Sequence, residues 1–186
     1  MNTMYNKKMI AMMLTLSMLA ASLAGCAGGD DDDDTSDWAI SMASDVEVVW
    51  VESGWDPIIP NLNAGEMCDV IISAMTKTEA RDQVVDFTRA YYTSSQGVIG
   101  GSGSASISDV SELNAAGITV GVQSGTTSDI FANGDADNVA NLADATVSAY
   151  DDFPSVIAAL NNGDVMYALG DAPVLALEGT LMTQFS

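Results

Sequence analysis

The sequence predicts an α/β fold made of two consecutive blocks of alternating strands and helices. Three observations indicate it: β-branched apolar runs recur along the chain, helix-starting residues follow them, and a glycine-rich stretch at 97–103 separates the blocks. Strands that alternate with helices form parallel sheets covered by helices. The 186 residues, 48% of them hydrophobic, suit two small lobes that each have a core.

The first block occupies residues 46–88, where strand patterns and helix patterns alternate. The expected elements are a strand at 46–51, a helix at 55–62 ended by Gly65, a strand at 69–74, a helical turn from Thr78 to Arg81 with Thr78 as its N-cap, and an extended segment at 84–88.

The second block continues the alternation after the glycine-rich stretch, which we interpret as a crossing between the lobes. The expected elements are a helix at 108–113, a strand at 118–122, a helix opening at Gly125, a strand at 146–150, a helix at 152–160 ended by Asn161–Gly163, a strand at 165–169 and a helix at 172–177.

Composition excludes several classes of function. The chain has 26 acidic residues, 5 basic residues and no histidine, for a net charge of −21. The absence of histidine excludes Ser-His-Asp catalysis, Cys-His catalysis and histidine metal sites. So negative a chain is unsuited to binding nucleic acid through its phosphates. The two cysteines lie too far apart for a zinc ribbon. We therefore assign no catalytic residue, metal site or cofactor.

The N-terminus has the pattern of an export signal. Lys7 and Lys8 precede the apolar run Met9–Leu23, and small residues lead to Cys26. Leu23–Cys26 (LAGC) resembles the lipobox of exported lipoproteins, which implies cleavage before Cys26 and its lipidation. The alternative is an uncleaved anchor helix at residues 1–26. Either reading places the rest of the chain outside the cytoplasm and attached to a membrane. Residues 27–37 (AGGDDDDDTSD) predict an acidic flexible linker.

Four segments together resemble the family 3 extracellular solute-binding proteins, the polar amino-acid receptors of ABC importers. They are WDPIIPNLNAGEMCD (55–69), ISAMTKTEARDQVVDFTRAYY (72–92), VGVQSGTTS (120–128) and FPSVIAALNNGDVMYALGDAP (153–173). The resemblance covers roughly residues 46–178. It implies a two-lobed, type II periplasmic-binding-protein-like fold that closes on an amino acid or similar zwitterion, with an ABC permease as partner.

The resemblance also implies the ligand-binding residues. Arg81 stands where the family's carboxylate-binding arginine stands, and a planar guanidinium suits a carboxylate because it donates two parallel hydrogen bonds. Asp171 matches the acid that holds the α-ammonium. The remaining expected site residues are Ala74 and Thr76, which support the carboxylate from the first lobe; Thr126 and Thr127, which bind it from a helix start; and Gln123, which recognises the ligand side chain.

Structural alternatives exist for these residues. The alternative for Arg81 is a surface arginine, for Thr126 and Thr127 capping residues, and for Asp171 the cap of the following helix. At the level of the whole protein, the alternatives are an enzyme on the same fold, either dehydratase-like or peptidoglycan-cleaving, and a degenerate or sensory ligand-binding domain.

The sequence is therefore expected to divide into residues 1–26 (lipoprotein signal peptide with lipobox), 27–37 (acidic flexible linker), 38–96 (partial first lobe) and 97–186 (second lobe). The first lobe is expected to be incomplete. The family's first strand, aromatic-bearing loop, first helix and second strand have no counterpart before Val46, and the segment that returns to the first lobe is not present by Ser186.

Overall fold

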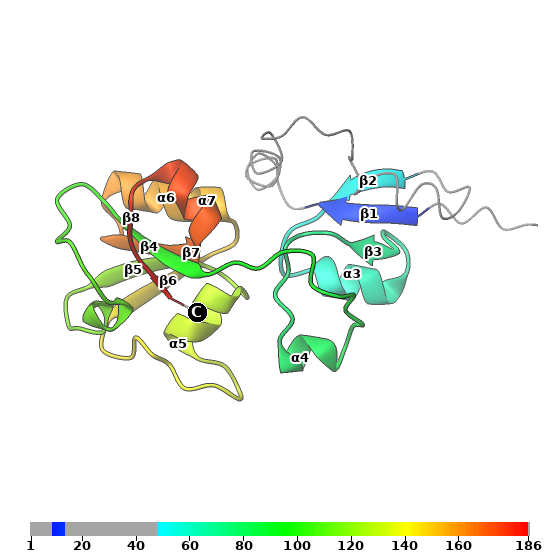
Figure 1. Ribbon diagram of the computed structural model, residues 1–186, viewed down its shortest axis with the longest axis horizontal. Helices are drawn as coiled ribbons and strands as arrows, with labels where there is room; N and C mark the ends of the chain where they lie inside the picture. Colours follow the sequence, from blue (N-terminus) through cyan, green and yellow to red (C-terminus); the bar gives the residue numbers. More distant parts are fainter. Residues whose placement is uncertain (1–8, 14–47, 186) are drawn as a thin grey trace, which may run out of the picture. The chain divides into compact units, whose positions relative to one another are not determined.

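The computed structural model describes residues 9–13 and 48–185, and the chain divides into two units, residues 1–87 and residues 88–186 (Figure 1). The expected lipobox at Leu23–Cys26 and the expected linker at 27–37 lie outside the described residues. Within the described ranges, no helix has the length and apolar character needed to cross a bilayer.

Unit 1 contains a three-stranded parallel sheet in the order β2-β1-β3. The strands are β1 (Met9–Met13), β2 (Val48–Glu52) and β3 (Val70–Ile71). Helix α3 (Ile58–Ala64) connects β2 to β3 and ends at Gly65, which has the left-handed φ of +67° that favours glycine. Helix α4 (Glu79–Asp82) follows β3, with Thr78 as its N-cap as expected.

The central strand β1 was not among the elements expected for the first lobe. Met9–Met13 comes from the apolar run of the predicted export signal, and it pairs with β2 on one side and with β3 on the other. Sequence pattern could not reveal this, because a short continuous apolar run fits a buried strand as well as a signal sequence.

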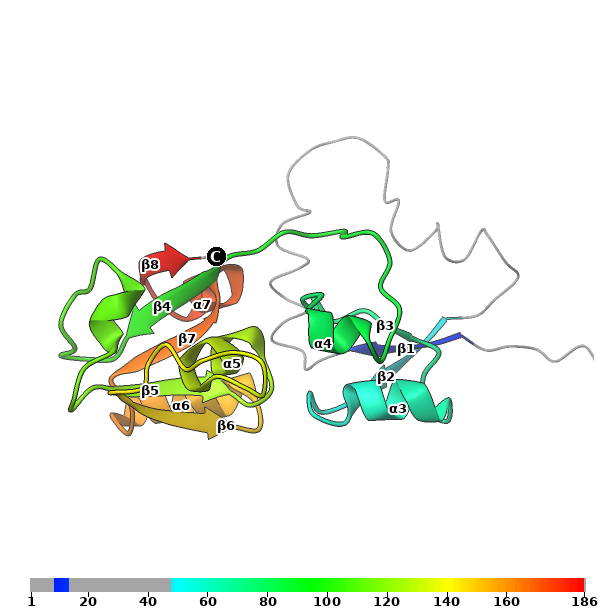
Figure 2. The same ribbon diagram turned by 90° about the horizontal axis from the view of Figure 1, so that it is seen from below.

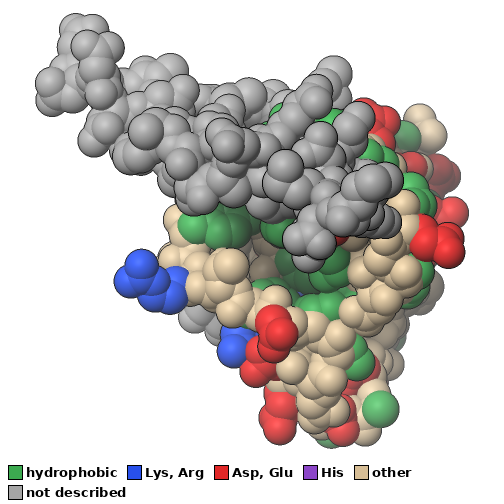
Figure 3. Space-filling model, turned by 90° about the vertical axis from the view of Figure 1, so that its right-hand side faces the viewer, with side chains coloured by type: hydrophobic (Ala, Val, Ile, Leu, Met, Phe, Trp, Pro, Cys, Tyr) green, Lys and Arg blue, Asp and Glu red, His purple; other side chains and the backbone are tan. Residues whose placement is uncertain are grey.

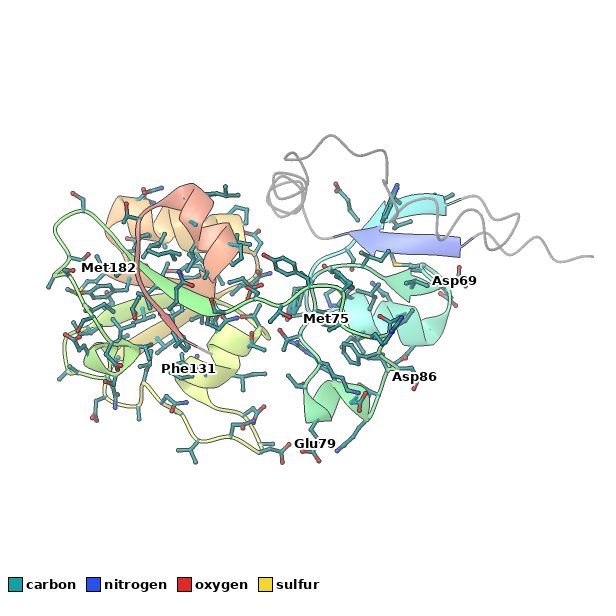
Figure 4. The ribbon with its side chains drawn as sticks, viewed as in Figure 1. Asp69, Met75, Glu79, Asp86, Phe131 and Met182 are labelled. Carbon is teal, nitrogen blue, oxygen red and sulfur yellow. The ribbon has the colours of Figure 1, made fainter. Side chains whose placement is uncertain are left out.

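The core of unit 1 lies around α3. Ile58 and Cys68 are buried, and Trp55, Leu62 and Met75 pack against them. Met75, labelled in Figure 4, follows β3. Burial raises the pKa of the Cys68 thiol, and the neighbouring Asp69 carboxylate raises it further, so this cysteine stays a neutral core residue at pH 7.

Unit 2 is built on a five-stranded sheet in the order β6-β5-β7-β4-β8, visible edge to edge in Figure 2. Strands β5, β6 and β7 run parallel, and β4 runs antiparallel to both β7 and β8. The elements in chain order are β4 (Gln96–Gly100), the 3-10 helix η1 (Val110–Leu113), β5 (Thr119–Gln123), α5 (Thr127–Asn133), β6 (Thr146–Tyr150), α6 (Phe153–Asn162), β7 (Tyr167–Asp171), α7 (Ala172–Glu178) and β8 (Leu181–Phe185).

Helices cover both faces of this sheet. Helices α6 and α7 lie on one face and α5 on the other (Figure 1). Alternate strand residues face the two layers: Val98 and Leu169 belong to the core cluster that includes Ala132 of α5. Ile99 and Ala168 belong to the cluster that contains α6 residues and Leu175 of α7. On the α5 face, the rings of Phe131 (labelled in Figure 4) and Phe185 have centroids 4.6 Å apart.

The expectation of a lobe crossing at 97–103 is wrong for its first residues, because Gly97–Gly100 lie inside β4. The division between units falls instead at Phe87 and Thr88. The glycines serve close packing: a Cβ on Gly97 would lie 2.8 Å from Leu181 Cδ2. One on Gly100 would collide with Met182, which Figure 4 labels on the neighbouring strand.

Two other elements differ from expectation. Residues 84–88 form no strand; Val84 and Val85 both donate their N–H groups to the Arg81 carbonyl and close a turn after α4. Strand β8 was not expected at all, because Leu181–Phe185 lacks a strict alternation of apolar and polar residues.

Candidate functional site

The candidate residues of unit 1 lie in the segments that follow β2 and β3. These strands are parallel, so Trp55, shortly after β2, and Ala74, shortly after β3, belong to the same, carboxyl-terminal edge of the sheet. Ala74 has a left-handed φ of +47°, and among the described residues it is the one non-glycine residue with a positive φ. Positive φ in a residue with a Cβ is uncommon and occurs preferentially at functional turns.

Arg81 is held in place rather than lying loose on the surface. It is the third residue of α4, and only 9% of its surface is exposed. Its Nη1 atom donates a 2.8 Å hydrogen bond to the Thr76 carbonyl, and its Cζ atom lies 5.2 Å from the centroid of the Trp55 ring. The interpretation of Arg81 as an ordinary surface arginine is therefore wrong. A buried, oriented guanidinium is suited to bind a carboxylate.

Thr76 contacts this arginine through its backbone. The contact that joins the two residues uses the Thr76 carbonyl, while the Thr76 side chain is exposed. The nearby basic residue Lys77 pairs with Asp82 at 2.9 Å, with both side chains in solvent. On the face shown in Figure 3, basic atoms lie beside acidic side chains at one place and stand apart from them at another. The exposed ion pair between Lys77 and Asp82 contributes little to the stability of the fold.

The candidate residues of unit 2 gather where its parallel strands end. Gln123 is the last residue of β5 and Asp171 is the last residue of β7, and these two strands are neighbours. From β5 the chain passes through α5 to β6 on one side, and from β7 it passes through α7 to β8 on the other. In open α/β sheets, ligands bind at the carboxyl ends of strands where the connections diverge in this way.

Gln123 is buried, with 3% of its surface exposed. Its Nε2 atom makes a long, 3.5 Å contact with the Asp151 carbonyl, and its Oε1 atom is a buried acceptor with no hydrogen-bond partner among the described residues. A buried polar atom without a partner is costly, so a ligand that donates a hydrogen bond would satisfy Oε1.

Thr126 acts as the N-cap of α5, as its structural alternative predicted. Its Oγ1 atom accepts from the Asp129 N–H at 3.4 Å and donates to the Gln123 carbonyl at 2.7 Å. The Asp129 carboxylate accepts from the Gly125 N–H at 2.9 Å. Thr127 is the first residue of the helix. The N–H groups of Thr127 and Ser128 have no acceptor within the helix because they belong to its first turn.

Asp171 does not act as a capping residue. It precedes α7 in the N-cap position, but its side chain makes no capping hydrogen bond. Its Oδ1 atom instead accepts a 2.5 Å hydrogen bond from Gln96 Nε2 on the adjacent strand β4. The interpretation of Asp171 as a mere helix cap is therefore wrong.

Three residues that contact the candidate residues directly or through one another were not among the expected site residues: Trp55, Gln96 and Ser128. The structure places the Trp55 ring beside the Arg81 guanidinium. Gln96 and Ser128 carry no motif of their own. Only the pairing of β4 with β7 brings Gln96 opposite Asp171.

Comparison with known proteins places the chain in a family. Residues 37–163 match the family model of bacterial extracellular solute-binding proteins, family 3. A probable histidine-binding protein of Campylobacter jejuni is 32% identical over 132 residues, which is 71% of this chain and 48% of that protein. The L-arginine-binding protein of Pseudomonas aeruginosa is 36% identical over 47% of this chain and 33% of that protein. The chain thus spans about half or less of these relatives.

Solved structures share the fold. An ancestral arginine-binding protein bound to arginine superimposes with a TM-score of 0.76 at 26% identity, covering 98% of this chain and 82% of that chain. An ancestral amino acid-binding protein, described as a precursor of cyclohexadienyl dehydratase, superimposes with a TM-score of 0.72 at 24% identity. This similarity supports a shared fold and says nothing of function. The expected two-lobed, type II α/β fold with an incomplete first lobe agrees with these neighbours. The chain belongs to family 3 of the bacterial extracellular solute-binding proteins.

Proposed function

We propose that this chain is an extracytoplasmic solute-binding protein, not an enzyme, that captures an amino acid and delivers it to an ABC permease. The observation that carries the proposal is the buried Arg81, whose guanidinium is oriented by the Thr76 carbonyl and the Trp55 ring. Family membership supports it, since relatives are named for binding histidine, arginine and lysine.

The proposal assigns one end of the ligand to each charged residue. Arg81 binds the α-carboxylate and Asp171 binds the α-ammonium, because an amino acid cannot leave water unless both of its charges are paired. The family resemblance assigns Ala74, Thr76, Thr126 and Thr127 to the support of the carboxylate. The Thr126 hydroxyl already caps α5. We therefore propose that Thr126 supports the carboxylate indirectly, by stabilising the start of this helix.

Gln123 is the proposed determinant of side-chain specificity. Its buried Oε1 atom accepts no hydrogen bond from the described residues, so it favours a ligand side chain that carries an N–H donor. Histidine, arginine, lysine and glutamine meet this requirement.

Calorimetric titration of the protein with the twenty amino acids tests the proposal. Removing one partner of a buried charge pair costs about 2–5 kcal/mol, so Arg81→Ala should weaken binding at least about 30-fold. Arg81→Lys should also bind poorly, because an ammonium does not reproduce the planar fork. Arg89→Ala is the matched control, since Arg89 is exposed and outside the cluster. Equal losses in Arg81→Ala and Arg89→Ala would contradict the assignment.

The proposal also includes a lipid anchor at Cys26, based on the lysines, apolar run and lipobox of the first 26 residues. The mature chain should fractionate with membranes and carry a lipid on Cys26. Cys26→Ser should release the protein or block its processing. Intact-mass analysis of the membrane fraction measures this, and a lipid-free soluble species that begins elsewhere would exclude the anchor.

A further inference from the structure

Three polar side chains of unit 2 form a directed chain of hydrogen bonds. The Ser128 hydroxyl, in the first turn of α5, donates to Gln96 Oε1. Gln96 is the first residue of β4, and its Nε2 atom donates to Asp171 Oδ1 at 2.5 Å. Gln96 and Asp171 are directly opposite each other in the antiparallel pairing of β4 and β7, so their side chains lie on the same face of the sheet.

The direction of this chain follows from the chemistry of its last member. An ionised carboxylate can only accept hydrogen bonds, so the Gln96 amide must present its NH2 group to Asp171. The opposite orientation would place an amide oxygen against a carboxylate oxygen. With Nε2 directed at Asp171, the amide oxygen faces Ser128, and the serine hydroxyl, which can donate or accept, must donate.

Burial makes this arrangement more than a surface contact. Ser128 is 2% exposed, and a buried hydroxyl needs a hydrogen-bond partner, which Gln96 supplies. Asp171 stands at the start of α7 but makes no capping hydrogen bond with its side chain. Its carboxylate is thus held by a residue of the sheet and kept from the helix that follows it.

We propose that Gln96 is a positioning residue that fixes the Asp171 carboxylate for the α-ammonium of the ligand, and that Ser128 fixes Gln96 in turn. This inference rests on the proposed function, in which Asp171 binds that ammonium. An ionised carboxylate offers about four acceptor positions, so a bond from Gln96 sets its orientation and leaves capacity for an ammonium. The protein thereby selects α-amino acids over carboxylates that lack the amino group.

Binding of two matched probes tests the inference: L-arginine, and 5-guanidinopentanoate, which is arginine without its α-amino group. A hydrogen bond to a charged group is strong, so Gln96→Leu should weaken L-arginine about tenfold while changing 5-guanidinopentanoate little. Ser128→Ala should show the same selective effect, smaller in size. Gln184→Leu is the control, because Gln184 is an exposed glutamine of the same sheet that bonds Ser95.

The Asp171→Asn background separates the two proposals. If Gln96 acts through Asp171, Gln96→Leu should have little further effect on L-arginine binding in that background. If Asp171→Asn itself leaves L-arginine binding unchanged, the proposed function is wrong. If Asp171→Asn weakens L-arginine selectively and Gln96→Leu does not, the positioning role alone is wrong.

A measurement on the ligand-free protein decides the positioning role even if the parent binds neither probe. The side-chain amide resonances of Gln96 should shift in the NMR spectrum when Asp171→Ala removes their acceptor, and those of Gln184 should stay in place. Unchanged Gln96 resonances in a folded Asp171→Ala variant would overturn the inference.

Discussion

The Cζ atom of Arg81 lies 5.2 Å from the centroid of the Trp55 ring. Trp55 follows β2 and Arg81 follows β3, so the contact joins the two segments that leave the carboxyl edge of the unit 1 sheet. A cation over an indole face is attracted by the ring quadrupole, more strongly when the pair is desolvated. The ring therefore holds the guanidinium from one side while the Thr76 carbonyl holds it at Nη1.

Loss of the Trp55 ring should weaken amino-acid binding. A desolvated cation–π contact contributes about 1–2 kcal/mol, so Trp55→Ala should reduce affinity about 5- to 30-fold, and Trp55→Phe should reduce it less. Calorimetry on both variants measures this. Trp50→Ala is the matched control, because Trp50 is 46% exposed on the outer strand β2. Equal affinities for Trp55→Ala and Trp50→Ala would show that the ring does not orient Arg81.

Acid should destabilise unit 2 through its helix caps. The hydroxyl and the N–H of Ser155 hold the pKa of Asp152, the N-cap of α6, below its ordinary value of 3.8. A lowered folded-state pKa gives stability that is present above the unfolded pKa and is lost as pH falls through the folded one. Asp152→Ala should lower the melting temperature at pH 6, and the difference from the parent should shrink below about pH 4.

Asp152→Asn separates charge from capping, because asparagine caps helices well without ionising. Its melting temperature should depend less on pH than that of the parent in the range from pH 5 to pH 3. If the parent and Asp152→Asn lose stability in parallel, groups other than Asp152 control the acid response. Asp109, Glu112 and Asp135 are the next candidates, since hydrogen bonds also lower the pKa of each of these carboxyls.

Salt should stabilise the whole chain. A net charge of −21 repels itself in the compact state, and salt screens this repulsion. The Debye length falls from about 30 Å at 0.01 M to about 3 Å at 1 M. The melting temperature should therefore rise with NaCl over this range. A flat curve would show that the acidic side chains are too far apart, or too well hydrated, to limit stability.

Sequence pattern predicted the elements whose boundaries are set by local chemistry. Thr78 caps α4, Gly65 ends α3 and Gly163 ends α6, because capping oxygens and left-handed glycines act within one turn of the chain. Strand β6 was predicted with its observed bounds, because Thr146, Val147 and Tyr150 are β-branched or aromatic residues that favour strands. These signals need no knowledge of the rest of the fold.

The elements and contacts that depend on distant partners were not predictable in this way. Gly97–Gly100 has the composition of a loop, but β7 and β8 on either side make it a strand. Gln96 is an ordinary polar residue in the sequence, and its hydrogen bond to Asp171 follows only from its place opposite Asp171 in the sheet. The resemblance to a family named Arg81 and Asp171 as candidate ligand residues; it could not name the side chains that contact them in the fold.

Strand β1 gives the last prediction, because the same residues cannot be both a removed export signal and the centre of a sheet. Met9–Met13 lies between β2 and β3, and within the described residues these two strands pair with β1 and not with each other. A chain that begins at Cys26 should therefore lose hydrogen-exchange protection at the amides of β2 and β3, while β4, β5 and β7 in unit 2 keep theirs.

A chain that begins at Lys8 keeps β1 and is the matched comparison. It should protect β2 and β3 and bind amino acids more tightly than the shorter chain, because Arg81 and Trp55 lie on segments that leave this sheet. Equal protection of β2 and β3 in the two chains would show that unit 1 folds without Met9–Met13, and cleavage before Cys26 would then cost nothing in binding. Selective loss of unit 1 in the shorter chain would mean that processing removes a strand on which the Arg81 cluster depends. In that case the proposed cleavage before Cys26 is wrong, and the chain that retains residues 9–13 is the form that binds.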